Sequence, residues 1–414
     1  MASLTYRSEI DGLRAVAVLA VVFYHLGPTF LPGGFVGVDV FFVISGFLIT
    51  SIILRESADR TFTLKNFWMR RIRRLFPALA VVLLATLAAG SLILYQKEWS
   101  SLGAQLFAVL ILLANFHLHI ETGNYWGPTA EDVPLLHTWS LAVEEQFYLL
   151  FPLLLLLLLR LGKRSIIPLL SLGALASLAH GILVTNTTPS YAFYLLPTRA
   201  WELLAGCLLA TWNWRRAPRN NPPAWTRPLP LLGILTVLAS CAFIDREGGF
   251  PGHQALFPVI GTVLVIAFTN HERSMVGACL SARPLVFVGK ISYSLYLWHW
   301  PIIVLWRLHS MDSVASPRHA IPIFLVSFTA ATLSYFFVER PFRRRAFPLL
   351  SPKFTIIVAV FLALLTLSHL VRSNHFRSGS RPAFQSPSFS FQPYSAEWDG
   401  AWKSGGVLVG DAPP

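Results

Sequence analysis

Long apolar stretches recur along the whole of this 414-residue chain and constrain its fold more than any other feature. Hydrophobic residues make up 54% of the chain and charged residues only 13%. A soluble domain carries about 25% charged residues, so this composition is typical of a chain that takes the bilayer as its solvent. The sequence therefore predicts an all-α, polytopic membrane protein.

Twelve apolar stretches are long enough, or nearly so, to form membrane helices. They cover residues 12–27, 35–54, 76–95, 102–120, 137–159, 166–185, 191–212, 229–244, 254–270, 285–306, 320–338 and 354–371. Lys and Arg in short loops are retained on the cytoplasmic side of a membrane. Arg7 and Arg14 therefore place the N-terminus in the cytoplasm, and the basic loop at 55–75 must lie on the same side.

This orientation leaves one apolar stretch too many. Three stretches separate the loop at 55–75 from the next basic loop at Arg160, and three crossings cannot return the chain to the side it left. We therefore predict about eleven transmembrane helices plus one re-entrant or interfacial segment, within 76–95 or 102–120. Such backbone is tolerated only beside protein or a water-filled cavity, which predicts a cavity nearby. Residues 372–414 then form an extracytoplasmic linker.

The net charge of +13 does not indicate a nucleic-acid partner, because the basic residues lie in short loops between apolar stretches. That placement instead favours contact with membrane lipids. The three cysteines show neither a CxxC motif nor a Cys/His spacing, so the sequence predicts no metal site.

Ionisable residues inside apolar helices are costly and call for a reason. Asp11, Arg14 and His25 share one face of the first predicted helix, with His25 about 16 Å beyond Arg14 along the axis. His25 is a candidate proton acceptor or acyl relay at membrane depth, since neutral imidazole can activate a hydroxyl or a thioester partner. The alternative is a cytoplasmic Arg14–Asp11 pair and a histidine hydrogen-bonded between helices. Asp39, in the second stretch, could orient His25, pair with an arginine, or be solvated at a helix end.

Four arginines lie beside aromatic residues between Phe67 and Pro77. Guanidinium groups bind phosphates through two parallel hydrogen bonds, so Arg70, Arg71 and Arg74 could hold a phosphorylated cytosolic cofactor. The alternative is an anchor for anionic lipid headgroups.

His137 and Glu144 stand seven residues apart at the start of the fifth stretch and are predicted to face the same way on a helix. A histidine and a carboxylate on one face are a plausible acid–base pair. Glu202, His299 and Glu339 are weaker candidates, each of which is also explained as a buried hydrogen-bonded group or a charge at a helix end.

Taken together, these motifs resemble the membrane acyltransferase 3 family, in particular its bacterial branch that O-acetylates lipopolysaccharide O-antigen or peptidoglycan. The resemblance covers residues 6 to about 345. The segments that carry it, besides His25 and the arginine run, are YRSEIDGLRAVA at 6–17, GVDVFFVISGFLI at 37–49, HTWSLAVEEQFY at 137–148, GKISYSLYLWH at 289–299 and VERPF at 338–342.

The resemblance implies an enzyme of the bacterial plasma (inner) membrane that moves an acyl group, usually acetyl, from cytoplasmic acyl-CoA (acetyl-CoA) to a hydroxyl of a cell-surface polysaccharide or a lipid-linked glycan. By position, Arg14 and His25 match the family's essential pair. Arg70, Arg71 and Arg74 match its RRxxR motif. The resemblance leaves open whether His25 carries the acyl group or only deprotonates the acceptor.

Two-domain members of the family continue into an extracytoplasmic SGNH-type domain, whose first strand ends in Gly-Asp-Ser. Here residues 406–411 resemble that strand, but Ala412 stands in place of the serine and the chain ends at Pro414. We therefore expect residues 1–371 to be the acyltransferase domain, with the SGNH-like domain missing and a separate SGNH-type transferase as a further partner. The alternatives are a proton-coupled carrier or flippase that uses His25, Asp39 and Glu144 as a relay, and a degenerate transferase.

Overall fold

The computed structural model describes residues 6–27, 31–122, 132–215, 223–245, 249–269, 274–310, 317–344 and 352–373. Every regular element in these ranges is a helix, which confirms the predicted all-α class. The predicted C-terminal linker lies outside the described residues except for Arg372 and Ser373.

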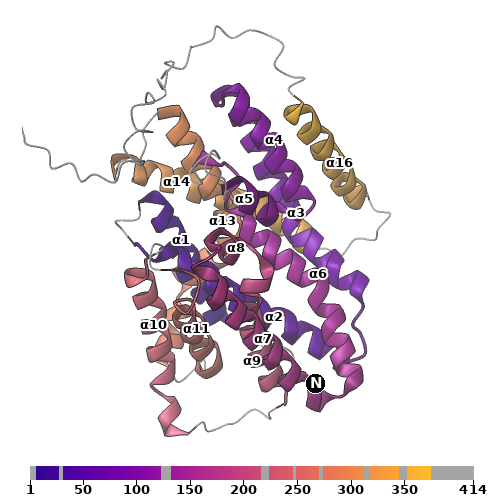
Figure 1. The fold of residues 1–414 in the computed structure, drawn as a ribbon, viewed down its shortest axis with the longest axis vertical. Coiled ribbons are helices and arrows are strands. Elements are labelled where there is room, and N and C mark those ends of the chain that lie inside the picture. Colours follow the sequence, from indigo (N-terminus) through magenta and orange to yellow (C-terminus); the bar gives the residue numbers. More distant parts are fainter. Residues whose placement is uncertain are drawn as a thin grey trace, which may run out of the picture. The chain divides into compact units, whose positions relative to one another are not determined.

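The elements follow the predicted stretches closely (Figure 1). The first half of the chain forms α1 (Ser8–Leu26), η1 (Gly34–Val36), α2 (Gly37–Ala58), α3 (Leu64–Ile93), α4 (Gln96–Leu110), α5 (Ala114–Thr122), α6 (Thr138–Leu161), α7 (Lys163–Thr185), α8 (Pro189–Tyr194) and α9 (Leu196–Arg215). The second half forms η3 (Ala224–Thr226), α10 (Leu229–Phe243), α11 (Leu256–Phe268), α12 (Met275–Leu280), α13 (Arg283–Ser310), α14 (Pro317–Ser334), η4 (Tyr335–Glu339), α15 (Arg340–Arg344) and α16 (Pro352–Arg372).

Seven of the described helices are long and apolar enough to cross a membrane. These spans are Gly34–Ala58, Leu64–Ile93, Thr138–Leu161, Lys163–Thr185, Ala224–Phe243, Arg318–Arg343 and Phe354–Arg372. Helices α1 and α9 fall outside this set, and both carry buried charged residues. The chain is thus a multi-pass membrane protein, and the count of eleven crossings stays a prediction.

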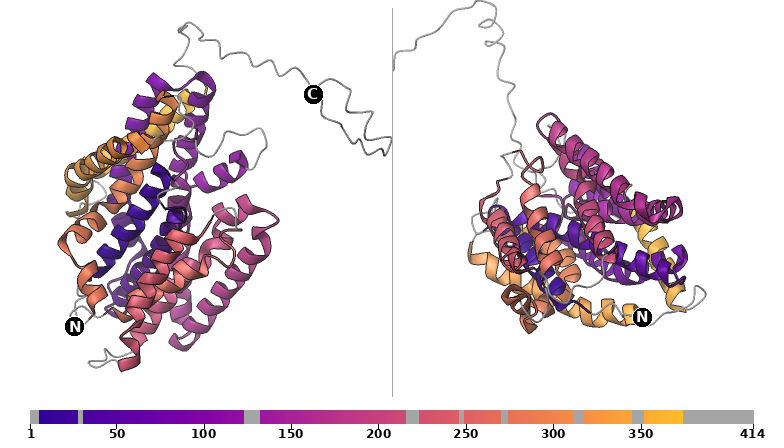
Figure 2. Two further views of the ribbon diagram at one scale, coloured as in Figure 1. Left: turned by 90° about the vertical axis from the view of Figure 1, so that its left-hand side faces the viewer. Right: turned by 90° about the horizontal axis from the view of Figure 1, so that it is seen from below.

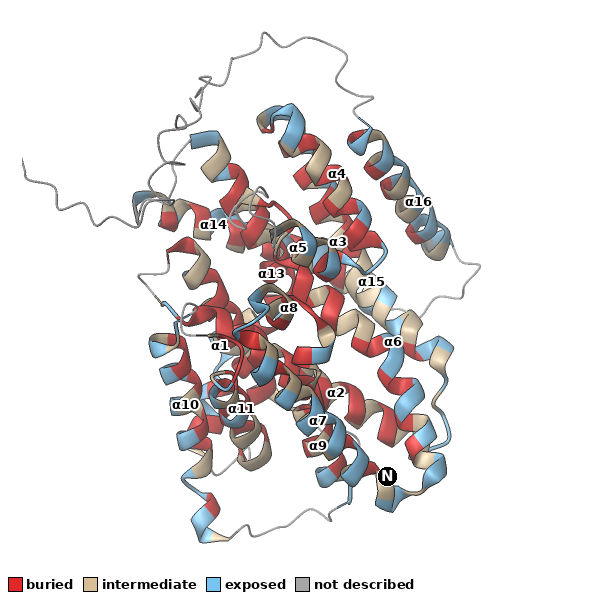
Figure 3. Cartoon of the chain, viewed as in Figure 1, coloured by how far each residue is buried: buried red, intermediate tan, exposed pale blue. Residues whose placement is uncertain are grey.

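The helices that carry the candidate site lie in the interior of the bundle. Helix α2 packs along α9, and α1 packs along α13. In Figure 2 the indigo N-terminal helices lie between the orange C-terminal helices and the magenta-to-pink helices α7 and α9. Figure 3 shows that burial concentrates on this central part, whereas the outer faces of α10 and α16 are exposed.

The exposed outer faces are apolar, as a lipid-facing surface requires. Leu150 of α6 is 58% exposed, and Leu172 and Leu183 of α7 are 65% and 74% exposed. The same surface would be an aggregation liability in water, because soluble proteins rarely expose large contiguous apolar patches. The bilayer therefore completes the burial that the bundle itself leaves open.

The predicted loop at 55–75 is wrong in its extent. Helix α2 continues to Ala58, and α3 begins at Leu64 after Thr63, whose side chain accepts a hydrogen bond from the Asn66 N–H at 3.3 Å. The arginine run is therefore helical and continuous with the third apolar stretch. A cap at Thr63 and a face that repeats every three to four residues favour helix here in spite of the charge.

The predicted stretch at 102–120 is broken into two short helices. Helix α4 ends at Leu110, and Leu112 takes a left-handed backbone conformation with φ 62° before α5 begins. Val109, Leu112 and Ala114, which flank this break, line a cavity of about 1250 Å³. A cavity thus lies near the region where one was predicted, and the re-entrant or interfacial placement of the segment stays a prediction.

Glycines let the central helices approach closely. A Cβ at Gly46 of α2 would lie 1.9 Å from the Leu203 carbonyl oxygen of α9, and a Cβ at Gly206 of α9 would lie 2.1 Å from the Val43 carbonyl oxygen of α2. Backbone contact of this kind is a common way to pack helices in membranes, where lipid tails give no hydrophobic drive.

We expect Gly46→Ala to lower the unfolding free energy by about 1–3 kcal/mol, because α2 and α9 must separate to admit the methyl group. Gly173→Ala in α7 is the matched control, since its Cβ would lie 3.6 Å from the nearest atom, in Leu204. Thermal unfolding of the purified protein in detergent measures both. Equal midpoints for the two variants would contradict the close packing.

Candidate active site

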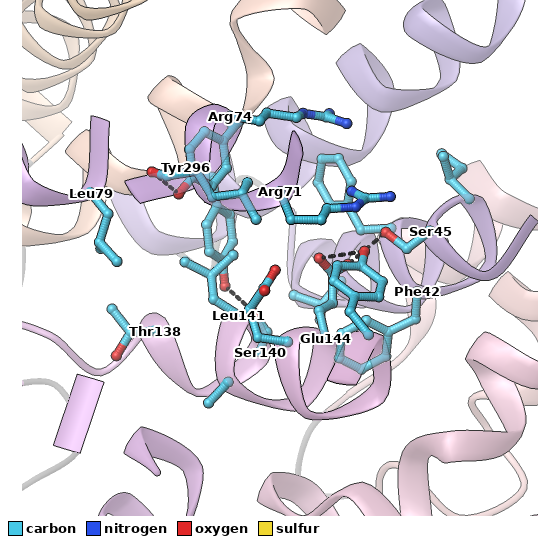
Figure 4. Close-up of a pocket in the computed structure, with 18 of the residues that line it drawn as sticks. Phe42, Ser45, Arg71, Arg74, Leu79, Thr138, Ser140, Leu141, Glu144 and Tyr296 are labelled. Carbon is cyan, nitrogen blue, oxygen red and sulfur yellow. Dashed lines mark hydrogen bonds between the residues drawn. The ribbon is translucent and has the colours of Figure 1, made fainter. Parts of the chain in front are cut away.

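A large cavity lies between α1, α2, α3, α6 and α13. It encloses about 1250 Å³, including its open mouth, and has a mostly apolar wall. Figure 4 shows Arg71 and Arg74 above Ser45 and Glu144 in this cavity. The ionisable side chains that line it, apart from the tyrosines, are Arg14, Arg71, Arg74, Glu144 and Glu145.

The arginine run contributes to this cavity selectively. Arg71 and Arg74 are one helical turn apart on α3, and both line the cavity. The Arg71 guanidinium lies 4.6 Å from the centre of the Tyr148 ring. Among the described residues, no carboxylate lies within 4.0 Å of either guanidinium. Both groups therefore keep their capacity to bind an anion.

Arg70 differs from its neighbours. It points about 100° away from Arg71 on the helix. Its Nη2 donates to Glu56 Oε2 at 2.8 Å, and its side chain is 41% exposed. The structure therefore does not bring Arg70 into the cavity with the other two arginines of the predicted set.

The opposite wall carries a carboxylate held by hydroxyl groups. Ser45 of α2 donates to Glu144 Oε1 at 2.8 Å, and Tyr148 donates to Glu144 Oε2 at 3.2 Å. Glu145 lines the same cavity. Sequence reasoning assigned neither Ser45 nor Tyr148, although both lie within motifs that carry the family resemblance. The i, i+4 spacing of Glu144 and Tyr148 was the available signal.

Arg14 also reaches the large cavity, from α1. Its Nη1 lies 3.6 Å from Asp11 Oδ1, and Tyr6 donates to the other Asp11 oxygen at 2.5 Å. The predicted Arg14–Asp11 pair is therefore present, and it does not remove Arg14 from the cavity wall.

A second, smaller cavity of about 520 Å³ contains the histidines. His25 and His137 line it together with aromatic side chains, and Val38 and Tyr296 line both cavities. Arg14 and His25 thus belong to the same helix but to neighbouring cavities. The wall between these cavities is thin, because it contains the same two side chains on both sides.

The His25 ring is tightly surrounded. Its Nδ1 lies 3.0 Å from Nε2 of His299, and its centre lies 4.5 Å from the Trp300 ring and 5.2 Å from the Tyr24 ring. His299, a weaker candidate in the sequence, is fully buried. The signal that sequence reasoning lacked is the contact between α1 and α13, which no periodicity reveals.

The predicted acid–base pair of His137 and Glu144 is not formed. His137 precedes α6 at its N-cap and lines the small cavity, whereas Glu144 lines the large one. The His137 carbonyl oxygen accepts a hydrogen bond from the Tyr296 hydroxyl at 2.8 Å, and Ser140 lies 2.6 Å from the same hydroxyl. The backbone of His137 is helical, with φ −56° and ψ −18°, but seven residues separate the two side chains by about 10 Å along the helix axis.

Asp39 does not contact His25 but belongs to a buried charge triad. Arg199 Nη2 lies 3.2 Å from Asp39 Oδ1, and Arg199 Nε lies 3.0 Å from Glu202 Oε1. All three side chains are at most 1% exposed. The guanidinium carbon of Arg199 also lies within 6 Å of the centres of four rings, those of Phe42, Trp139, Phe193 and Phe250.

The triad therefore pins α2 to α9, and Asp39 takes the arginine-pairing alternative. The aromatic ring contacts stabilise the guanidinium further, because a cation attracts the faces of such rings.

Within the described ranges no group of three or more His, Cys, Asp or Glu side chains is placed to hold a metal ion.

We expect Arg199→Met to lower the unfolding free energy by about 3–5 kcal/mol, since it leaves two carboxylates buried without a counter-ion. Adding Asp39→Asn and Glu202→Gln to that variant should recover part of the loss. Thermal unfolding in detergent measures the three proteins. A triple variant no more stable than Arg199→Met would show that the charges are not the reason for the loss.

Comparison with known proteins agrees with this architecture. The acyltransferase domain family matches residues 7–338, and the chain belongs to this family of membrane acyltransferases. The peptidoglycan O-acetyltransferase OatA of Listeria monocytogenes is 36% identical over 354 residues, which cover 83% of this chain and 56% of that protein.

Two further relatives are similar at the same level. The O-acetyltransferase OatA of Staphylococcus aureus strain MRSA252 is 36% identical over 395 residues, covering 91% of this chain and 64% of that protein. The putative peptidoglycan O-acetyltransferase YrhL of Bacillus subtilis is 34% identical over 362 residues, covering 83% and 56%. The chain thus spans less than two thirds of the length of these relatives. No solved structure matches.

Proposed function

We propose that this protein is a membrane O-acyltransferase that passes an acetyl group from cytoplasmic acetyl-CoA to a hydroxyl of a cell-surface polysaccharide. One observation carries this proposal. Three arginines from two helices line a single cavity, and that cavity shares Val38 and Tyr296 with the cavity that holds His25. A wall of guanidinium groups beside a half-buried imidazole is the arrangement that thioester chemistry needs.

The large cavity suits the donor. Arg71 and Arg74 would bind the phosphates of acetyl-CoA, because planar guanidinium groups match phosphate geometry. The apolar wall, with Leu75 and Leu79, would receive the less polar arm that carries the thioester. With the N-terminus in the cytoplasm of a bacterial plasma membrane, α3 begins on the side where acetyl-CoA is available.

His25 would perform the transfer step. As a base, it takes the proton of the acceptor hydroxyl while the oxygen forms a bond to the thioester carbonyl carbon; the carbon–sulfur bond then breaks, and the thiolate takes the proton from the imidazolium. As an acyl relay, its ring nitrogen forms the bond to the carbonyl carbon, and the carbon–sulfur bond breaks to release the thiolate. The acceptor hydroxyl oxygen then bonds to the same carbon as the bond from the ring nitrogen breaks, and the hydroxyl proton passes to the thiolate. Both routes need a nitrogen lone pair on a neutral ring.

The relatives' names favour peptidoglycan as the acceptor. The sequence resemblance alone covered O-antigen and lipid-linked glycans as well. Supplying purified peptidoglycan fragments or lipid-linked glycan to the same assay distinguishes these acceptors.

We expect Arg71→Ala and Arg74→Ala each to weaken acetyl-CoA binding by about 1–3 kcal/mol, as for loss of a charged hydrogen bond. Arg70→Ala is the matched control, because Arg70 belongs to the same run but pairs with Glu56 outside the cavity. Isothermal titration of the three variants in nanodiscs measures the effect. An equal loss of acetyl-CoA affinity in all three variants would favour the alternative that the arginines anchor lipid headgroups. Absence of acetyl-CoA binding by the unsubstituted protein would favour a carrier.

We expect His25→Ala to abolish the consumption of radiolabelled acetyl-CoA while leaving its binding within about twofold, because His25 lies outside the cavity assigned to the phosphates. Thioester release and label on protein or acceptor are followed together. Retained turnover in this variant would remove His25 from the chemistry. Unchanged elution on size-exclusion chromatography controls for folding.

A further inference from the structure

The contact between His25 and His299 has the geometry of a hydrogen bond between two ring edges. The Nδ1 atom of His25 lies 3.0 Å from Nε2 of His299, and the two ring planes are inclined by only 22°. The ring centres are 5.2 Å apart, close to the nitrogen–nitrogen distance plus the two ring radii. The two nitrogens therefore point at each other edge to edge, and one of them must donate its proton to the other.

The backbone of α13 decides which nitrogen donates. His299 Nδ1 lies 2.7 Å from the Tyr296 carbonyl oxygen and 3.2 Å from the Leu295 carbonyl oxygen. Carbonyl oxygens only accept hydrogen bonds, so His299 carries a proton on Nδ1. The His299 side chain is fully buried, and a second proton would create an imidazolium without hydration. The ring is therefore neutral, with its lone pair on Nε2.

A lone pair on His299 Nε2 requires a proton on Nδ1 of His25. A neutral His25 then has its own lone pair on Nε2, at the far edge of the ring. We propose that His299 is a positioning residue that holds His25 in the Nδ1–H tautomer, so that Nε2 is the ring nitrogen of His25 that carries no proton. This inference rests on the proposed function of His25.

The contact with His299 gives the Nδ1–H of His25 an acceptor that carries no charge. Histidines that act as bases or ligands usually donate their second N–H to a carboxylate or a backbone carbonyl. Asp39, which the sequence offered for this role, is engaged with Arg199. A neutral imidazole whose own tautomer is set by helix carbonyls does the same work without adding a charge beside His25. Trp300 also contacts the His25 ring, with the ring centres 4.5 Å apart, and is itself fixed, since its Nε1 donates to the Val133 carbonyl oxygen at 2.8 Å.

The test compares two replacements of His299. The Oε1 atom of Gln in His299→Gln can accept from His25 Nδ1, whereas His299→Leu offers no acceptor. We expect His299→Leu to lower the turnover of acetyl-CoA by about 10- to 100-fold with unchanged donor binding, and His299→Gln to restore most of it. His180→Leu is the control, because His180 is a half-buried histidine of α7 whose Nε2 lies 3.4 Å from the Tyr191 hydroxyl.

Nitrogen-15 NMR of histidine-labelled protein in nanodiscs reads the tautomer directly. The His25 signals are assigned by their loss in His25→Ala. In the unsubstituted protein we expect His25 to carry its proton on Nδ1 and none on Nε2. In the His299→Leu variant we expect His25 to exchange between its two neutral tautomers. A proton on Nε2 of His25 in the unsubstituted protein would overturn the proposal, and so would an unchanged tautomer in His299→Leu.

The two hypotheses fail separately. A protein that shows the expected tautomers but consumes no acetyl-CoA with any acceptor would contradict the proposed function and leave the role of His299 intact. Normal turnover in a folded His299→Leu variant would contradict the role of His299 and leave the proposed function intact. If His299→Leu does not fold, the unsubstituted protein and His299→Gln still report the tautomer.

Discussion

The cost of charge inside an apolar bundle governs this structure. A lone ionised side chain away from water is strongly unfavourable, so each buried charge must find a partner or a wet cavity. The Arg199 guanidinium meets that requirement with Asp39 and Glu202, and Glu144 meets it with two hydroxyl groups. Arg71 has no carboxylate of the described residues within 4.0 Å and lines the cavity instead. The difference separates charges that hold helices together from charges that are available to a ligand.

Close helix packing makes this distribution of charge possible. The triad needs α2 and α9 to lie near each other, and Gly46 and Gly206 let their backbones touch. A second close approach, of Gly289 in α13 to the Asp11 carbonyl oxygen of α1, brings together the helices that carry His25 and His299. The glycines far from the chemistry therefore set the contacts on which the site depends.

Much of this architecture follows from the sequence, because apolar length and charge position are local properties. The helical class, the predicted stretches and a cavity beside an interrupted segment all depended on such properties. Which helices pack against each other does not follow from the sequence, and the wrong predictions of the site arise from this. Helical periodicity grouped His137 with Glu144, but about two helical turns separate them along the axis and they line different cavities. Spacing also grouped Arg70 with Arg71, but neighbouring residues of a helix point about 100° apart. Arg70 therefore pairs with Glu56 at the surface, whereas Arg71 lines the cavity.

The division into two cavities suggests why the buried histidines need a neutral environment. A donor that carries several phosphates would bring strong negative charge to the cavity lined by Arg71 and Arg74. Val38 and Tyr296 separate that charge from His25, and the Tyr296 hydroxyl is already directed to the His137 carbonyl oxygen and Ser140. In the proposed function, a His25 ring hydrogen-bonded to a second neutral imidazole would keep its lone pair whether or not the donor is bound. In the proposed function, the binding of the donor's charge and the use of the His25 lone pair would thus take place in two neighbouring cavities.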